Sequence, residues 1–285
     1  MGVAGGGVNA LRGESNVQGS TDHCLLWHIW PGYLKTPRAS DTSLTVYNDK
    51  YTPKSNDPQS ANWWQNYPKY SVSLLKSFFG EKATAGNEFG YNWLPKVDDG
   101  KVYSWLDIFD EMYKGTIKGF LAWGQNPACS GANANKTRKA LAKLDWMVNV
   151  NLFDNETGSF WKGPGVNPAS VKTEVFFLPA AASVEKEGSI TNSGRWSQWR
   201  YQGPKPLGNS LPDGQMIIEL GNRIKAEYQK GGTFPEPIAN LKWDYLTKGE
   251  YDPHKVAKEI NGYFQKDVTV KGKNFKKGTL VPSFA

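Results

Sequence analysis

The chain has 285 residues, of which 39% are hydrophobic, and its 12 Trp, 13 Tyr and 13 Phe are enough for a sizeable core in one or two domains. This composition excludes a disordered chain. The net charge of +7 is scattered along the sequence. The densest basic run, residues 271–277, lacks the interleaved aromatic residues of a single-strand binding platform and is interpreted as a solvated tail or turn, so we expect no nucleic-acid partner.

Cysteine usage and apolar runs exclude further classes. Cys24 and Cys129 are far apart in sequence and form no CxxC pair, so we interpret them as two buried thiols without a metal-cluster signature. No window approaches eighteen uninterrupted apolar residues, and the N-terminus lacks a basic region followed by a hydrophobic one. We therefore expect neither a membrane span nor an export leader in this chain.

The chain opens on a glycine-rich run, residues 5–22, which presents Arg12 among small polar side chains. Glycines let backbone amides approach a ligand closely, and the guanidinium fork matches a planar carboxylate or a phosphate. The pattern therefore predicts an anion site.

The next segment, residues 33–103, is rich in Pro, Asn, Ser, Lys and Trp and shows little strand character apart from short helical stretches such as 70–79. We interpret it as an irregular, Trp-rich insertion. A different pattern begins near Ser104. It predicts a helix over 105–113 that ends at Gly115, followed by an apolar strand that ends at residue 123.

Three strands are predicted in the middle of the chain, over residues 117–123, 146–151 and 173–178, with a helix over 135–144 between the first two. This order predicts an α/β fold with a doubly wound, mostly parallel, Rossmann-like sheet and a ligand at the carboxyl ends of its strands. Neither GxGxxG nor GxxxxGK[ST] occurs, which disfavours ordinary NAD, FAD or P-loop ATP binding.

The C-terminal part is expected to be helical. Helices are predicted over residues 213–228 and from Asp252 to about residue 264, and the second places His254 at the surface. In the first helix one apolar stripe is expected to pack in the core: Met216, Ile217, Leu220 and Ile224.

Four motifs occur in an order that resembles the catalytic (alpha) subunit of molybdenum- or tungsten-dependent formate dehydrogenases, members of the dimethyl sulfoxide reductase superfamily. They are residues 12–19, 124–127, 173–179 and 187–195. The resemblance covers nearly the whole chain, and the Trp-rich segment is similar to the elaboration of the larger, respiratory type of subunit.

The resemblance implies an enzyme that oxidises formate to carbon dioxide at molybdenum or tungsten held between two molybdopterin guanine dinucleotides. Electrons would pass to a 4Fe-4S cluster and then to an iron-sulfur electron-transfer subunit, in the periplasm, in anaerobic respiration. The family's cluster cysteines and its selenocysteine or cysteine metal ligand have no counterpart here, and neither has its C-terminal barrel domain. We therefore expect an internal fragment that is inactive alone and supplies no metal ligand.

The resemblance implies four regions. Residues 1–32 form a glycine-rich segment that contacts substrate and pterin, and residues 33–103 are the insertion. Residues 104–230 form the Rossmann-like domain that binds molybdopterin guanine dinucleotide. Residues 231–285 are a helical extension leading to a missing C-terminal domain.

The resemblance gives two residues roles near the substrate. Arg12 would orient the formate carboxylate, and His28, with Trp63, would line the substrate path; the simpler alternatives are a surface or pyrophosphate-binding arginine and a core histidine. The other polar candidates could equally be turn formers, and Asn151 stands where an acidic residue would bind guanine more strongly. The expected cofactor contacts are Glu14, Asn16, Gln18, Gly124, Asn126, Asn151, Asp154, Thr157, Glu187, Asn192 and Arg195.

Other functions stay open at this stage. The chain could be a segment of another molybdopterin oxidoreductase of the same superfamily, or a non-catalytic binding module. Twelve tryptophans could also build a carbohydrate-binding surface, but the strand-helix-strand order disfavours an all-β lectin-like module.

Overall fold

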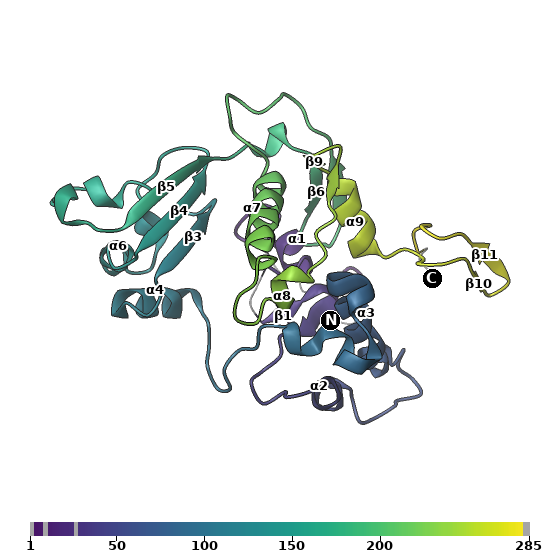
Figure 1. Cartoon of the computed structure of the whole chain (residues 1–285). Helices are drawn as coiled ribbons and strands as arrows, with labels where there is room; N and C mark the ends of the chain where they lie inside the picture. The colour runs from purple at the N-terminus through teal and green to yellow at the C-terminus, as the bar shows by residue number, and fades with distance from the viewer. Residues whose placement is uncertain (1–2, 8–10, 26–27, 282–285) are drawn as a thin grey trace. The chain divides into compact units, whose positions relative to one another are not determined.

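A parallel sheet of three strands forms the middle of the chain in the computed structural model, which describes residues 3–7, 11–25 and 28–281 (Figure 1). The strands are β3 (Gly119–Trp123), β4 (Trp146–Asn151) and β5 (Glu174–Pro179), in the order β3-β4-β5. Both pairs are parallel. The predicted α/β class and parallel pairing are therefore confirmed.

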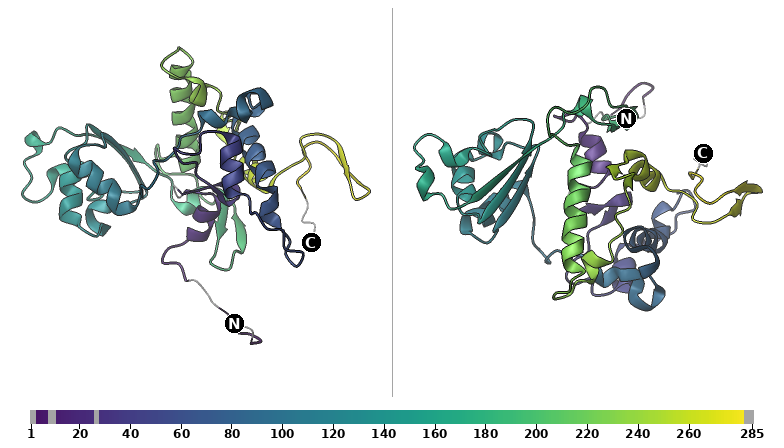
Figure 2. Two further views of the ribbon diagram at one scale, coloured as in Figure 1. Left: turned by 90° about the horizontal axis from the view of Figure 1, so that it is seen from below. Right: turned by 45° about the horizontal axis from the view of Figure 1, so that its top comes forward.

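Helices α4 (Trp105–Lys114) and α6 (Ala134–Leu141) lie along one face of this sheet (Figure 2). Met112 and Leu141 pack against Met147 of β4, and all three side chains are fully buried. The α4 helix begins and ends where its sequence predicts. Ser104 caps its first turn, and Gly115 ends it with a φ of 81°, a conformation that glycine adopts at little cost.

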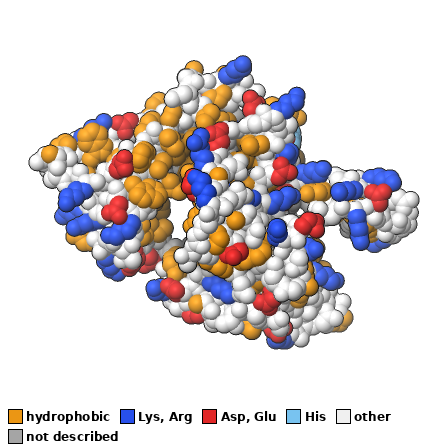
Figure 3. All heavy atoms as spheres, viewed as in Figure 1, with side chains coloured by type: hydrophobic (Ala, Val, Ile, Leu, Met, Phe, Trp, Pro, Cys, Tyr) orange, Lys and Arg blue, Asp and Glu red, His pale blue; other side chains and the backbone are white. Residues whose placement is uncertain are grey.

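The opposite face of the sheet carries apolar side chains that reach solvent. Leu121 and Phe176 are 45% and 46% exposed, and orange side chains gather over these strands in Figure 3. Leu121 and Phe176 share that face because both are in register with Val148. Parallel sheets normally have both faces covered. The structure thus shows a mixed helix-and-sheet fold with a three-stranded parallel sheet, and the doubly wound arrangement stays a prediction.

The chain divides into two units, which are described separately. The sheet unit comprises Gly100–Lys186 and Tyr201–Met216, and the second unit comprises Met1–Asp99, Glu187–Arg200 and Ile217–Ala285. The helix α7 (Asp213–Tyr228) begins in the first and continues in the second. The sheet unit also contains the short helix α5 (Pro127–Ser130).

Short elements make up the second unit. Its helices are α1 (Val17–Asp22), α2 (Leu44–Tyr51), α3 (Tyr67–Phe79), α8 (Glu236–Ala239) and α9 (Pro253–Asn261). Its strands pair as antiparallel hairpins: β1 (Ile29–Trp30) with β2 (Leu34–Lys35), β6 (Gly188–Thr191) with β7 (Ser197–Arg200), β8 (Leu246–Thr247) with β9 (Glu250–Tyr251), and β10 (Val268–Val270) with β11 (Lys273–Phe275).

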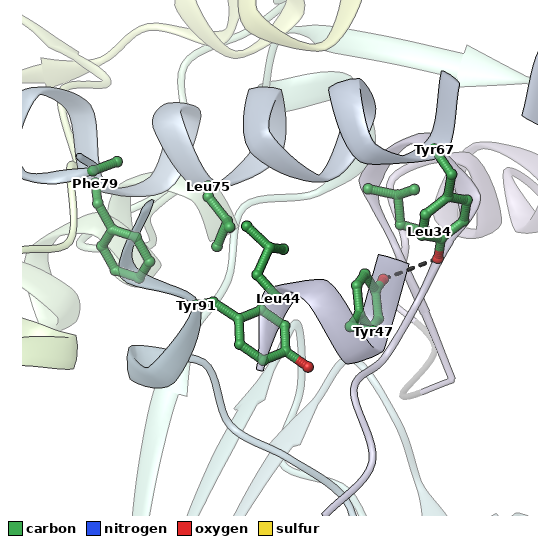
Figure 4. Packing of buried hydrophobic residues seen from close by; sticks show 8 residues of the cluster. Leu34, Leu44, Tyr47, Tyr67, Leu75, Phe79 and Tyr91 are labelled. Atoms are coloured by element: carbon green, nitrogen blue, oxygen red, sulfur yellow. Dashed lines mark hydrogen bonds between the residues drawn. The ribbon is translucent and has the colours of Figure 1, made fainter. Parts of the chain in front are cut away.

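The Trp-rich segment builds a hydrophobic core of its own. Leu34 and Leu75 are almost completely buried, and three tyrosines surround them (Figure 4). The hydroxyls of Tyr47 and Tyr67 lie 2.9 Å apart, so the polar ends of two buried rings satisfy each other. Burial is the main cause of the raised pKa of both tyrosines. These contacts hold α2 and α3 together.

The α7 helix has the predicted bounds, but the predicted core stripe is wrong for three of its four residues. Ile217, Leu220 and Ile224 are 40–42% exposed, whereas Met216 and Ile218 are buried. The reason is that Trp243 packs closely against another face of the helix, where a Cβ added at Gly221 would lie 3.0 Å from the Trp243 ring. The spacing of apolar residues along the helix does not predict this contact.

Both cysteines were expected to be buried, and this is also wrong. Cys129 is exposed, because the short α5 helix buries Pro127 and Ala128 instead, and Cys24 is partly exposed. Among the described residues no helix combines the length and apolarity needed to cross a membrane.

Candidate cofactor-binding sites

The carboxyl end of β3 leads into a hydrogen-bonded cluster of predicted site residues. Gly124, with a φ of 64°, turns the chain there, and its N–H donates to the carbonyl of Val150 at 2.9 Å. Asn126 then meets the loop that follows β4. Its Oδ1 accepts from the N–H of Thr157 at 3.2 Å and from the Thr157 hydroxyl at 2.9 Å. Parallel pairing therefore brings two of the predicted loops to one edge.

A second set of amides continues along this edge. The carbonyl of Gln125 lies 3.3 Å from the Nδ2 atoms of both Asn151 and Asn155, and each amide donates to it. The Oδ1 of Asn155 accepts from Gly158 N–H at 3.0 Å and from Asn149 at 3.2 Å. Asn149 is completely buried, and its Oδ1 has no partner within the part of the chain that the structure describes. Amide side chains of this kind can read the polar edge of a base.

Two carboxylates add negative charge to this cluster, which we call the strand-end cluster (residues 124–126, 149–151 and 154–158). Hydrogen bonds from Ser159 and then Lys162 lower the pKa of Asp154, and Asn126 lowers that of Glu156 by donating at 2.6 Å. Lys162 also forms an ion pair with Asp154 at 3.0 Å. Both carboxylates are therefore ionised at neutral pH and can accept hydrogen bonds from ribose hydroxyls or base amines.

A cavity of about 450 Å³ lies beside β5 in the same unit. Asp154 and Gly158 line it together with apolar side chains that include Trp161 and Val175. Asn126 and Asn151 do not line it. The cavity thus shares one predicted site residue with the strand-end cluster and does not coincide with it.

In the other unit, the glycine-rich segment meets the β6–β7 hairpin. The Oδ1 of Asn16 accepts from the N–H of Thr191 at 2.9 Å, which joins residues 175 positions apart. Gln18, in α1, is 2% exposed and donates to Asp22 at 2.8 Å. The two motifs that the sequence predicted to act together are therefore adjacent here. Residues 8–10 of the glycine-rich run lie outside the described residues.

Arg195 lies at the turn of the β6–β7 hairpin. Its Nη2 donates to the hydroxyl of Tyr33 at 3.0 Å, and its guanidinium carbon lies 5.5 Å from the centre of the Tyr33 ring. The Tyr33 hydroxyl in turn donates to the Asp22 carboxylate. Arg195, Tyr33 and Asp22 form a contact set that we call the arginine clasp.

The remaining residues of this hairpin have structural partners. Glu187 accepts from the Trp199 indole N–H at 2.8 Å and lies 3.0 Å from Nε2 of His254. His254 is 63% exposed in its side chain, as predicted. Asn192 accepts from the N–H groups of the turn at 3.0 and 3.1 Å, so its side-chain oxygen shapes the hairpin.

The residues predicted near the substrate occupy different environments. Arg12 is partly buried, Glu14 is exposed, and His28 is exposed. The alternative of a core histidine is therefore wrong for His28. Trp63 is 63% exposed and lies beside Tyr70, with 5.2 Å between the ring centres and an angle of 31° between the ring planes.

Sequence reasoning missed several members of both clusters. Asp22 follows Gln18 by one helical turn, a spacing that brings side chains together and could have indicated the pair. Asn155 lies directly beside the predicted Asp154. Asn149 lies within an apolar strand, and Tyr33 lies in the segment interpreted as irregular, so neither carried a local signal.

The sequence of the chain is similar to formate dehydrogenase subunits of several bacteria. The chain is 60% identical over 287 residues to formate dehydrogenase subunit alpha of Megalodesulfovibrio gigas. It is 49% identical over 285 residues to formate dehydrogenase 2 subunit alpha (cytochrome c-553) of Nitratidesulfovibrio vulgaris, and 41% identical over 293 residues to formate dehydrogenase-O major subunit of Escherichia coli. Each match covers the whole chain, which spans 28–29% of the length of these relatives. No protein-family model matches the chain.

Proposed function

Because this chain is homologous over its whole length to part of the formate dehydrogenase alpha subunit, we propose that it is the segment of such an oxidoreductase that binds molybdopterin guanine dinucleotide and orients formate. In this proposal residues 104–230 belong to a doubly wound domain that holds the guanosine. The remainder of the subunit would supply the iron-sulfur cluster and the protein ligand of molybdenum or tungsten.

The observation that carries the proposal is the strand-end cluster. The amides of Asn126 and Asn151 and the hydroxyl of Thr157 make hydrogen bonds at the carboxyl edge of parallel strands, which is where nucleotides bind in α/β folds. The carboxylate of Asp154 belongs to the loop that follows β4. The buried, unpaired Oδ1 of Asn149 is a further acceptor there. A Cβ placed on Gly124 would meet nothing within 4 Å, so the turn leaves room for a ligand. The donor set suits a guanosine.

The other candidate residues belong to the second unit, and their roles are proposed for that unit by itself. Arg12 would bind the carboxylate of formate, and His28 would line its path. When bound, the metal centre would supply the redox chemistry of formate oxidation, while Arg12 holds the carboxylate in a fixed orientation. The contacts to pterin or diphosphate would come from Glu14, Asn16, Gln18, Glu187, Asn192 and Arg195.

We also propose the setting in which the complete enzyme works. An iron-sulfur subunit would accept the electrons, and the enzyme would be periplasmic and respiratory. The name of the Nitratidesulfovibrio relative refers to a cytochrome c-553, which agrees with electron transfer to another protein.

The test uses Asn151, which stands at the end of β4. Guanine presents an imino and an amino N–H side by side, and a carboxylate accepts both in charge-assisted hydrogen bonds. The Asn151→Asp variant should therefore bind guanosine diphosphate about tenfold more tightly than the unmodified chain, a gain of about 1.4 kcal/mol. Affinity for adenosine diphosphate should not rise. Isothermal titration calorimetry on the 285-residue chain measures both.

The matched control is Asn167→Asp, which adds the same charge at an amide that caps a short turn elsewhere in the sheet unit. It should leave both affinities unchanged. Equal affinities of the Asn151→Asp variant for the two nucleotides, or nucleotide-induced NMR shifts confined to residues outside the strand-end cluster, would refute guanosine binding at this edge.

A further inference from the structure

Arg195 is held by two residues to which the proposed function assigns no role. We propose that Tyr33 and Asp22 are positioning residues, which hold the Arg195 guanidinium in the orientation in which it binds the diphosphate group of a guanine dinucleotide. This inference rests on the proposed function, in which Arg195 binds diphosphate. It adds the residues that set the orientation of the Arg195 side chain.

The distances identify the hydroxyl of Tyr33 as the main contact. It accepts from Nη2 of Arg195 at 3.0 Å, whereas the nearest Asp22 oxygen lies 3.9 Å from the same nitrogen. The Tyr33 ring also lies against the guanidinium at 5.5 Å, a distance at which a cation and an aromatic face attract. Tyr33 therefore fixes both the position and the tilt of the guanidinium.

Asp22 fixes Tyr33 in turn. Its carboxylate accepts from the Tyr33 hydroxyl and, at 2.8 Å, from Nε2 of Gln18. Gln18 is 2% exposed, so one end of this chain of hydrogen bonds is anchored in the interior. Because the Asp22 carboxylate is held by two donors, the Tyr33 phenol that donates to it has little freedom to rotate.

The protonation state of Tyr33 determines the direction of its hydrogen bonds with Asp22 and Arg195. Burial, followed by the hydrogen bond to Asp22, raises the pKa of Tyr33, so the phenol stays neutral at physiological pH. A neutral phenol has one proton, which it donates to Asp22, and its oxygen accepts from Arg195. The short contact of the Arg195 guanidinium is therefore with a neutral phenol, and the Asp22 carboxylate lies farther away, at 3.9 Å.

Exposure leaves the cation available to a ligand. The Arg195 side chain is 65% exposed, and among the described residues it contacts Tyr33 and Asp22. A guanidinium that is oriented in advance and reaches solvent suits a diphosphate, which accepts two parallel N–H bonds from one fork. Arg195 and Tyr33 also both adopt left-handed backbone conformations, with φ values of 61° and 62°, which concentrates backbone strain at this site.

The test removes only the hydroxyl. Tyr33→Phe keeps the ring under Arg195 but deletes the acceptor, so we expect the affinity of the 285-residue chain for inorganic pyrophosphate to fall about tenfold. The Nε–Hε signal of Arg195, assigned by its loss in Arg195→Lys, should show a lower order parameter. Thermal unfolding should stay close to that of the unmodified chain. Calorimetry and NMR relaxation measure these effects.

The matched control is Tyr228→Phe, which deletes the hydroxyl of a tyrosine in α7 and should change neither readout. If pyrophosphate affinity is unaffected by Arg195→Lys, the assignment of Arg195 to the diphosphate is wrong, and the proposed function loses that contact. If Arg195→Lys weakens binding while Tyr33→Phe behaves like the control, Arg195 binds diphosphate but Tyr33 does not position it, and this inference alone fails.

Discussion

The Thr157 hydroxyl donates to Oδ1 of Asn126 at 2.9 Å and so links two segments that lie 31 residues apart in sequence. The same hydroxyl accepts from the buried N–H of Ala128 at 3.0 Å. Thr157 itself is completely buried. One side chain therefore holds the turn after β3 against the loop after β4.

Replacing Thr157 by Val should destabilise the chain by about 1–3 kcal/mol. The shape of the side chain is kept, but the buried N–H of Ala128 loses its acceptor, and an unmet buried donor is costly. Thr52→Val is the matched control, because the Thr52 hydroxyl is buried with no partner among the described residues. Its removal should be neutral or stabilising. Urea unfolding followed by circular dichroism gives both free energies, and equal effects of the two substitutions would contradict the role of Thr157.

Local signals in the sequence were sufficient for several elements. Ser104 and Gly115 are chemically suited to begin and end a helix, and α4 lies between them. The predicted bounds of β4 and α7 are also confirmed, because turn-forming residues border strongly apolar runs there. The strand-helix-strand order likewise predicted the parallel sheet that brings the loops of the strand-end cluster together.

Contacts between distant residues could not be predicted in this way. The buried face of α7 depends on how closely Trp243 approaches Gly221, which no periodicity encodes. The arginine clasp joins Tyr33 and Arg195, which are 162 positions apart. Motif order indicated that the two segments act together, but it did not indicate which side chains meet.

Asp252 should stabilise helix α9 in a pH-dependent way. Its carboxylate accepts from the N–H of His254 at 2.9 Å, an N-cap contact, so Asp252→Ala should cost about 1 kcal/mol at pH 7. Asp244→Ala, which removes only an exposed partner of Lys255, should cost less than about 0.5 kcal/mol. Urea denaturation of the two variants makes the comparison.

The sign of the pH dependence follows from the lowered pKa of Asp252, whose largest cause is a hydrogen bond from Thr247. A carboxyl with a lowered folded-state pKa stabilises the fold above its unfolded pKa of about 3.9 and loses this effect as the pH falls through the folded value. The difference between the unmodified chain and Asp252→Ala should therefore be constant from pH 7 to pH 5 and shrink below about pH 4. A difference that grows in acid would contradict this account.

The two cysteines should react with thiol reagents at different rates. Cys129 is exposed, whereas burial raises the pKa of Cys24 and lowers the fraction of its reactive thiolate. Labelling with a disulfide reagent at pH 7.5 should thus show a fast phase and a slow phase. Cys129→Ser should remove the fast phase and Cys24→Ser the slow one. A single phase with both cysteines present would show that their environments are equivalent.

The 285-residue chain alone should not oxidise formate. A 4Fe-4S cluster requires four thiolate ligands, and the chain has two cysteines. The assay supplies formate and a viologen dye after reconstitution with cofactor and metal. Turnover on the order of 1 per second would contradict the prediction.

Arg12→Lys should impair formate oxidation in a full-length enzyme that contains this segment. Lysine keeps the charge but lacks the fork that binds both carboxylate oxygens, so transition-state stabilisation should fall by roughly 2–4 kcal/mol in kcat/KM. Metal and pterin contents should stay near normal, because the substrate carboxylate is the group that Arg12 is proposed to hold. Arg200→Lys, at an exposed arginine of β7, should leave the kinetics unchanged. A variant whose only defect is loss of cofactor would instead assign Arg12 to the binding of the dinucleotide.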